Sequence, residues 1–131
     1  MFDRTTIVSS NVYDILQTTQ NPLSVQMIIN QLKKKSLHPN KATIYRILKK
    51  LKDKNAITEF TARNGASFYE ISGQHHHHFI CNHCDTAYCL SGCHMETKHI
   101  SISDLLPNNN FKPESHDFNI YGICEPCSLN T

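Results

Sequence analysis

Two pairs of cysteines, each with two residues between its members, constrain this chain more than any other feature. Cys81 and Cys84 form the first pair, and Cys124 and Cys127 form the second pair far downstream. Two-residue spacing lets both sulfurs of a pair face one ion, and two such pairs supply the four thiolates of a closed, tetrahedral zinc site. The sequence therefore predicts a structural Zn2+ site that joins two distant segments of the chain.

Four consecutive histidines, residues 75–78, lie just before the first cysteine pair. A four-thiolate site does not need them, so they indicate additional metal. If residues 75–80 form a strand, side chains alternate between its faces, with His76 and His78 on one face and His75 and His77 on the other. One strand could then serve two ions. A closed metal site with spare ligands favours a metal sensor over a metalloenzyme.

The length of 131 residues fits one domain or two very small ones. No apolar run approaches membrane-spanning length, and the first ten residues lack the basic-then-apolar build of a secretory signal. We expect a cytoplasmic protein with no membrane partner and no small-molecule substrate. In that compartment, reduced cysteines bind metal more often than they form disulfides.

Charge divides the chain into two parts. Residues 1–58 contain ten lysines and arginines against three acids, whereas residues 59–131 contain three against eight. All six cysteines and eight of the nine histidines fall in the acidic part. We predict a basic domain at residues 1–71 and a metal-binding domain at residues 72–131.

Helical periodicity dominates the basic part. Apolar residues recur at helical spacing in residues 11–18 and 25–32, with Ser24 as a candidate N-cap of the second helix. Asn40 can cap a third helix, whose apolar stripe consists of Ile44, Ile47, Leu48 and Leu51. Residues 56–61 and 66–71 then flank Asn64-Gly65, a pair typical of the tight turn of a β-hairpin.

Three helices followed by a hairpin is the order of a winged helix-turn-helix, in which a recognition helix enters the major groove. The face of the third helix opposite its apolar stripe carries the candidate DNA-contacting residues Lys41, Thr43, Tyr45, Arg46 and Lys49. A solvated surface is the simpler interpretation of a lysine-rich face. Within residues 31–55, however, nine positive charges oppose only Asp53, which favours phosphate binding.

Four segments of the chain, taken together, resemble the ferric uptake regulator superfamily of metal-dependent repressors. They are Ala42-Thr43-Ile44-Tyr45-Arg46-Ile47-Leu48, Phe68-Tyr69-Glu70, the run from His75 to Cys84, and Tyr121-Gly122-Ile123-Cys124-Glu125-Pro126-Cys127. The resemblance implies an α+β fold, with an N-terminal winged helix followed by a small α/β dimerisation domain. It also implies a homodimer that binds double-stranded DNA at a palindromic operator when a regulatory metal is present.

Two further ligand sets match positions of metal sites in that superfamily. The set resembling its regulatory, hinge-spanning site is Glu70, His76, His78 and Cys89. The set resembling its second site, near the dimer interface, is His75, His77, Glu96 and His116. In the implied mechanism, metal bound at the first set fixes the angle between the two DNA-binding modules of a dimer, and metal and DNA binding strengthen each other reciprocally.

The regulatory set departs from iron- and peroxide-responsive members, which usually place Asp or Glu where Cys89 stands. One carboxylate, two imidazoles and a thiolate favour tetrahedral zinc over octahedral iron or manganese, and a thiolate beside redox-cycling iron is prone to oxidation. We therefore favour a zinc sensor, as in the zinc uptake regulator branch, with an iron- or peroxide-responsive regulator as the alternative. Cys89 could instead be a small buried hydrophobe, and Cys93 and His94 lie close enough in sequence to compete as ligands.

Two other classes of protein compete with a metal sensor. A zinc hydrolase needs an open coordination position and a general base, and no H-E-x-x-H or deaminase motif occurs in the sequence, so we do not expect an enzyme. A constitutive DNA-binding protein with purely structural zinc is the second alternative. It would hold one zinc per subunit and bind its operator without added metal.

Overall fold

The computed structural model describes residues 4–73, 77–90, 102–114, 116 and 119–130. The chain divides into two compact units, Met1–Gly73 and Gln74–Thr131, which together mix helices and small sheets. Across the described ranges, no helix is both long enough and apolar enough to cross a membrane.

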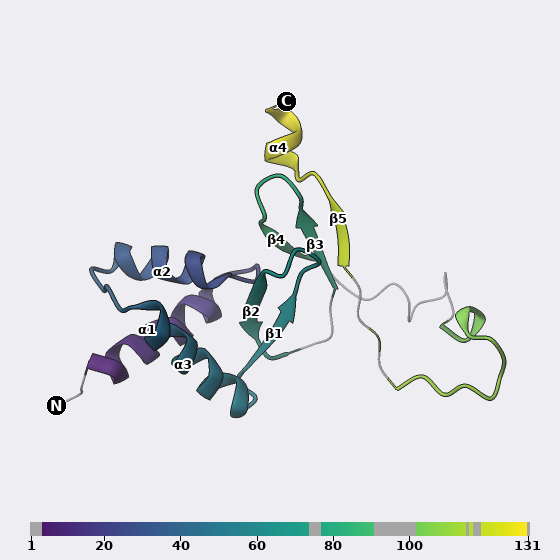
Figure 1. Cartoon of the computed structure of the whole chain (residues 1–131), viewed down its shortest axis with the longest axis horizontal. Helices are drawn as coiled ribbons and strands as arrows, with labels where there is room; N and C mark the ends of the chain where they lie inside the picture. Colours follow the sequence, from purple (N-terminus) through teal and green to yellow (C-terminus); the bar gives the residue numbers. More distant parts are fainter. Residues whose placement is uncertain (1–3, 74–76, 91–101, 115, 117–118, 131) are drawn as a thin grey trace. The chain divides into compact units, whose positions relative to one another are not determined.

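The first unit contains three helices followed by a two-stranded hairpin (Figure 1). The helices are α1 (Arg4–Thr18), α2 (Val25–Lys34) and α3 (Lys41–Asp53), and the strands are β1 (Ile57–Thr61) and β2 (Ser67–Ile71). The predicted order of elements is therefore confirmed. The first helix was predicted at residues 11–18 only and begins seven residues earlier, at Arg4. Its added turns contribute Val8, which is buried one helical turn before Val12.

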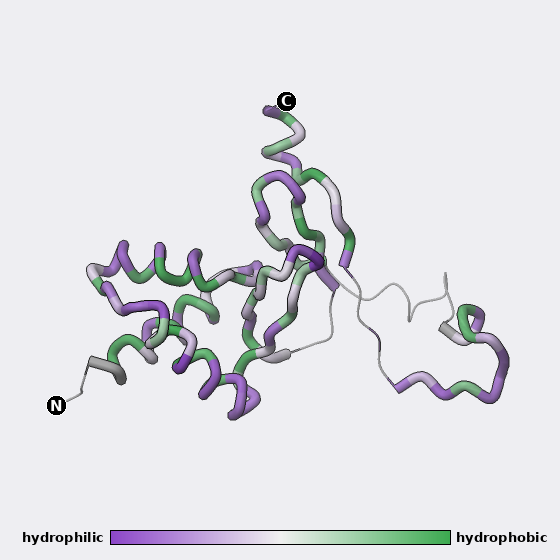
Figure 2. The backbone as a smooth tube through the Cα atoms, viewed as in Figure 1, coloured by the Kyte–Doolittle hydropathy of each residue, from purple (hydrophilic) through white to green (hydrophobic). Residues whose placement is uncertain are grey.

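Side-chain caps set the starts of α2 and α3, as predicted. The Ser24 hydroxyl accepts a hydrogen bond from the Met27 N–H at 3.3 Å, and the Asn40 side chain accepts one from the Thr43 N–H at 2.9 Å. Both caps satisfy an amide that the first helical turn would otherwise leave unbonded. They fix where each amphipathic face begins, and Figure 2 shows apolar and polar residues alternating along α2 and α3.

The core of the first unit is built from one face of each helix and the inner side of the hairpin. From α3, Ile44, Ile47 and Leu48 are fully buried, whereas Leu51 is only half-buried against the same cluster. Two backbone hydrogen bonds, from Leu23 N–H to Tyr69 C=O and from Tyr69 N–H to Leu23 C=O, tie the α1–α2 connection to β2 at 2.9 and 2.8 Å. The hairpin is thus fixed to the helices by backbone bonds as well as by packing.

The hairpin pairs β1 with β2 in antiparallel register, from Ile57 opposite Ile71 to Thr61 opposite Ser67. The chain reverses at Asn64-Gly65, as predicted, where Gly65 adopts a φ of 92° and Asn64 Oδ1 accepts a hydrogen bond from the Ala66 N–H. That positive φ suits glycine, which has no Cβ to clash.

The second unit is organised around a three-stranded sheet of order β4-β3-β5. Its strands are β3 (His77–Cys81), β4 (Ala87–Leu90) and β5 (Asn119–Gly122). Strand β4 is antiparallel to β3 and β5 is parallel to it. A 3-10 turn, η2 (Ile102–Leu105), precedes β5, and a short helix, α4 (Glu125–Leu129), follows it. The central strand therefore receives a neighbour from each of the two cysteine-bearing segments.

Candidate metal centres and nucleic-acid interface

The four paired cysteines converge in the second unit. Ligand atoms of Cys81, Cys84, Cys124 and Cys127 all lie within 4.8 Å of one another, and the Sγ atoms of Cys84 and Cys124 are 3.7 Å apart. A tetrahedral ion with zinc–sulfur bonds of about 2.3 Å requires sulfur–sulfur separations of about 3.8 Å. The thiol set therefore fits a closed zinc site, which would join the β3–β4 turn to α4.

Close packing of β5 against β3 brings the second cysteine pair to the first. Gly122 lies beside Cys81 in the parallel register, and the Asn82 N–H donates to the Gly122 carbonyl at 2.8 Å. A Cβ on Gly122 would lie 3.1 Å from the ring of Phe79. Glycine at this position lets the strand approach without displacing that ring, and Cys124 follows two residues later.

Backbone amides prepare Cys81 to act as a thiolate. Its Sγ accepts hydrogen bonds from the N–H groups of His83, Cys84 and Cys124 at 3.3, 3.4 and 3.4 Å. These donors, that of Cys84 first, lower the pKa of Cys81 to about 6 although burial opposes the shift. Since the thiolate is the form that binds metal, the turn is organised for ligation before an ion arrives.

The pKa values of the two cysteines of the second pair shift in opposite directions. Cys124 stands at the N-cap of α4, and the nearby Cys127 N–H lowers the pKa of Cys124, although this contact is looser than a capping hydrogen bond. The hydrogen bond with Cys124 in turn raises the pKa of Cys127 to about 12. Cys127 is therefore the harder of the two thiols to deprotonate, and metal binding there must release its proton.

Part of the predicted regulatory set meets across β3 and β4. His78 faces Cys89 directly in the antiparallel register, with ligand atoms within 4.8 Å of each other. His78 is buried and Cys89 is half-buried. Glu70 lies on β2 in the first unit, opposite Thr58, and His76 is outside the described residues. The structure thus brings two of the four predicted ligands together within one sheet.

Part of the second predicted set also meets. The rings of His77 and His116 have centroids 5.1 Å apart and are tilted by 34°, and His77 is only 2% exposed. His77 and His78 are adjacent in β3, so they occupy opposite faces of the sheet. Positions outside the described residues include the other two members of this set, His75 and Glu96, and the competing ligands Cys93 and His94.

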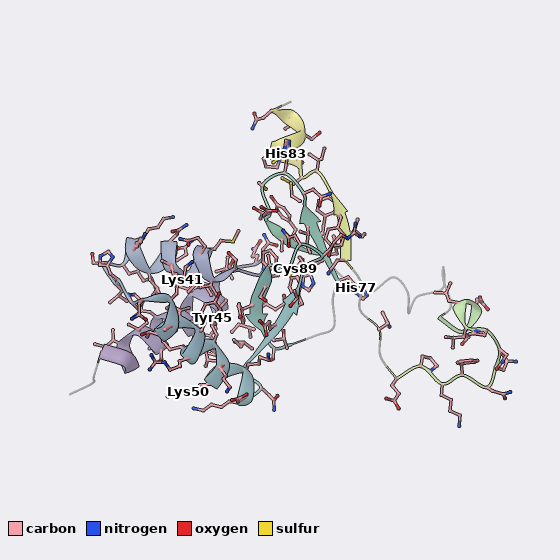
Figure 3. All side chains as sticks on the ribbon, in the orientation of Figure 1. Lys41, Tyr45, Lys50, His77, His83 and Cys89 are labelled. Atoms are coloured by element: carbon pink, nitrogen blue, oxygen red, sulfur yellow. The ribbon has the colours of Figure 1, made fainter. Side chains whose placement is uncertain are left out.

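The basic face of α3 is open to solvent. Figure 3 shows Lys41, Tyr45 and Lys50 on this helix, and Tyr45 is 52% exposed despite its large ring. Arg46 and Lys49 are also exposed, whereas Thr43 is half-buried. An exposed aromatic ring among cations suits contact with base edges between phosphates.

Lys52, near the end of α3, is less available to DNA than the other lysines of this helix because it pairs with Glu59. This pairing was not predicted from the sequence. Lys52 Nζ lies 2.7 Å from Glu59 Oε1, and the Tyr69 hydroxyl donates to Glu59 Oε2 at 2.9 Å. The hydrogen bond from Lys52 is the main cause that lowers the pKa of Glu59. Glu59 therefore neutralises part of the charge that the sequence assigns to the basic region.

Comparison with known proteins identifies the family of the chain. A model of the ferric uptake regulator family matches residues 4–121. The chain is 29% identical over 106 residues to the ferric uptake regulation protein of Bordetella parapertussis, covering 80% of this chain and 74% of that protein. It is 30% identical over 115 residues to the protein of the same name from Campylobacter upsaliensis, covering 87% and 71%.

Solved structures share the fold. The ferric uptake regulator of Helicobacter pylori superposes with a TM-score of 0.75 at 24% identity, covering 93% of this chain and 80% of that one. A zinc uptake regulator from Mycobacterium tuberculosis superposes with a TM-score of 0.52 at 23% identity, covering 95% of each chain. Proteins of this kind are metal-responsive transcriptional regulators and not enzymes. On the extent of the family match, this chain belongs to the ferric uptake regulator family.

Proposed function

We propose that this protein is a cytoplasmic, zinc-responsive repressor that controls metal homeostasis by binding a palindromic operator as a homodimer. The observation that carries the choice of zinc is the pairing of His78 with Cys89 across β3 and β4. A nitrogen and a sulfur ligand held face to face suit tetrahedral zinc, whereas iron(II) and manganese(II) sites favour oxygen ligands and octahedral geometry.

The structural site is assigned to Cys81, Cys84, Cys124 and Cys127. When bound there, Zn2+ would cross-link the β3–β4 turn to α4 without an open coordination position, so it would support folding and no chemistry. The three backbone amides that point at Cys81 supply fixed donors to the sulfur. This arrangement supports a permanently bound ion.

The regulatory site is assigned to Glu70, His76, His78 and Cys89. Glu70 is the neighbour of Tyr69, whose backbone and hydroxyl fix β2 to the α1–α2 connection and to β1. Because β2 is fixed within the first unit, an ion bound by Glu70 together with His78 and Cys89 would link the first unit to the second. Metal would thereby set the relative orientation of the two units, which is the proposed switch. A further ion at His75, His77, Glu96 and His116 is proposed as an additional site, supported by the close His77 and His116 rings.

The DNA interface is assigned to the exposed face of α3 and to a major-groove half-site for each subunit. Tyr45 is assigned to apolar contact with thymine methyl groups, because its ring is large and exposed. Lys41, Arg46 and Lys49 are assigned to phosphates, which position the helix without reading sequence, and Thr43 lies beside them. The two helices of a dimer would then reach half-sites about one helical turn apart.

Operator affinity of the dialysed protein, measured with zinc, iron(II) and manganese(II) added separately, tests the proposal. We expect zinc to raise affinity most, and Cys89→Ser to lose that selectivity while retaining the structural ion. His83→Ala is the matched control, because His83 is an exposed histidine of the same unit that contributes only its backbone N–H to Cys81. Equal zinc response in Cys89→Ser would remove Cys89 from the site, and stronger activation by iron(II) would favour an iron regulator. Operator affinity that none of the three metals changes would favour a constitutive DNA-binding protein with purely structural zinc.

A further inference from the structure

Two side-chain hydroxyls lie next to the four-cysteine cluster, and neither has a role in the proposed function. Thr86 immediately precedes β4, and Tyr88 is the second residue of that strand. Residues two apart on a strand share a face, and Tyr88 lies opposite Phe79 in the register. Phe79 is in turn two residues before Cys81 on β3, so both hydroxyl-bearing residues occupy the face that carries Cys81.

Each hydroxyl contacts a different sulfur. The Cys84 thiol donates a hydrogen bond to Thr86 Oγ1 at 3.2 Å, and the Tyr88 hydroxyl hydrogen bonds with Cys124. Cys81 already receives three backbone donors. Among the described residues, hydrogen bonds with groups other than the cysteine side chains therefore reach three of the four sulfurs, and for Cys84 and Cys124 the partner is a hydroxyl, which can also act as a donor.

The charge of a zinc-loaded cluster gives these contacts their importance. Four thiolates around one Zn2+ carry a net charge of −2, and no lysine or arginine occurs in residues 64–97 or 113–131, which hold every cysteine of the cluster. Asp85 and Glu125, the chain neighbours of Cys84 and Cys124, add further negative charge. Metal-bound sulfurs carry no proton and can only accept hydrogen bonds, so both hydroxyls must donate. Charge-assisted bonds of this kind are stronger than neutral ones.

Cys84 is the exposed member of the cluster, so its bond to an ion is the one that water and competing ligands can reach. We propose that Thr86 and Tyr88 are positioning residues of the structural zinc site, whose hydroxyls donate to the thiolates of Cys84 and Cys124 and slow loss of the ion. The inference rests on the proposed occupancy of the four cysteines by zinc. Cys89 follows Tyr88 in the strand and therefore points to the opposite face of β4. One strand would thus retain the permanent ion with one face and serve the exchangeable ion with the other.

The rate at which the zinc-loaded full-length protein transfers its ion to an excess of chromophoric chelator tests the inference. We expect Tyr88→Phe and Thr86→Val each to release zinc about tenfold faster, because outer hydrogen-bond partners of metal ligands typically change metal affinity by about 10- to 100-fold. Thr86→Ser should restore the slow rate, since it keeps the hydroxyl. Tyr121→Phe is the matched control, because Tyr121 lies opposite Ile80 and so belongs to the other face of the sheet.

A second readout separates hydrogen bonding from packing. In cobalt(II)-substituted protein, Tyr88→Phe and Thr86→Val should move the sulfur-to-cobalt charge-transfer band to lower energy, because a thiolate that loses a donor gives up an electron more easily. Unchanged band energies and wild-type release rates in both variants would overturn the inference while leaving the zinc site intact. A wild-type protein with no tightly held zinc would instead refute the occupancy itself, and metal analysis distinguishes that result.

Discussion

Lys52 Nζ on α3 lies 2.7 Å from Oε1 of Glu59 on β1, so the end of the basic helix is bonded to the hairpin that follows it. Glu59 also accepts the Tyr69 hydroxyl through its second oxygen. One carboxylate therefore connects three consecutive elements of the first unit, α3, β1 and β2. It also removes one lysine from the charge that the helix can offer to DNA.

Releasing Lys52 should strengthen non-specific DNA binding. We expect Glu59→Gln to bind unrelated duplexes more tightly at low salt, with a salt dependence steeper by up to one phosphate contact, because each neutralised phosphate adds about 0.9 to the slope. A salt titration of wild type and variant on a duplex lacking the operator measures this. Gln keeps the size of the side chain, so an unchanged slope would show that Lys52 does not reach DNA.

Acid should weaken the bond between α3 and the hairpin. The hydrogen bond from Lys52 lowers the pKa of Glu59, so the carboxylate stabilises the fold above the ordinary glutamate pKa of about 4.3 and loses this effect as pH falls through its lowered value. Urea unfolding of wild type and Glu59→Gln should therefore differ most near neutral pH and converge in acid. A difference that stays constant with pH would contradict the ion pair as its source.

Removing the Tyr45 ring should weaken specific binding more than a lysine substitution. We expect Tyr45→Ala to lower operator affinity by about 10- to 100-fold, which corresponds to the roughly 1–3 kcal/mol of a base contact, and Tyr45→Phe to retain most of the affinity. Lys49→Ala should weaken operator and unrelated duplexes equally and lower the salt slope by about one. Competition binding with both duplexes compares the three variants. Equal loss on both duplexes for Tyr45→Ala would place the ring on the backbone instead of the bases.

Crowding at Gly122 should loosen the four-cysteine cluster. In Gly122→Ala the added methyl would lie 3.1 Å from the Phe79 ring, and overpacking of this kind costs about 1–3 kcal/mol. We expect a lower melting temperature and faster zinc loss. Phe79→Leu combined with Gly122→Ala should recover part of both, because the smaller side chain removes the clash. If the melting temperature and zinc-loss rate of the double variant equal the sum of the two single effects, the strain does not arise from contact between the added methyl and the Phe79 ring.

Breaking the cluster should affect the two units unequally. Cys124→Ser removes one thiolate, and a structural zinc site contributes directly to folding. The core of the first unit contains no cysteine, so its helices should persist while the second unit loses order. Circular dichroism should retain most of its helical signal, and proteolysis should spare residues 4–73. Complete loss of helix would show that the first unit depends on the second.

Local patterns in the sequence predicted the helices of the first unit and two of their caps. Ser24 and Asn40 cap α2 and α3 because a short polar side chain before an apolar periodic run satisfies the first amides locally. The early start of α1 was missed because residues 4–10 contain threonines and serines, which are weak helix formers in isolation. Packing of Val8 against the core decides that start, and packing depends on distant residues.

Contacts between distant residues were predictable only where the chemistry demanded them. Cysteine spacing predicted that residues 81–84 and 124–127 meet, because four thiolates suit one ion. The pairing of Lys52 with Glu59 depends on how α3 packs against β1. The positions of the Thr86 and Tyr88 hydroxyls beside the sulfurs depend on the register of β4 with β3. Register sets which side chains share a face, and the sequence alone carries little information on it here.

The five residues of β3 present His77 to one side, His78 to the other and Cys81 at the end. An insertion or deletion of one residue within this strand would exchange the two sides and separate every ligand from its partners at once. Point substitutions, in contrast, can alter either proposed ion site by itself. The metal preference of such a sensor can therefore be retuned by exchanging side chains, whereas the length of its central strand is fixed.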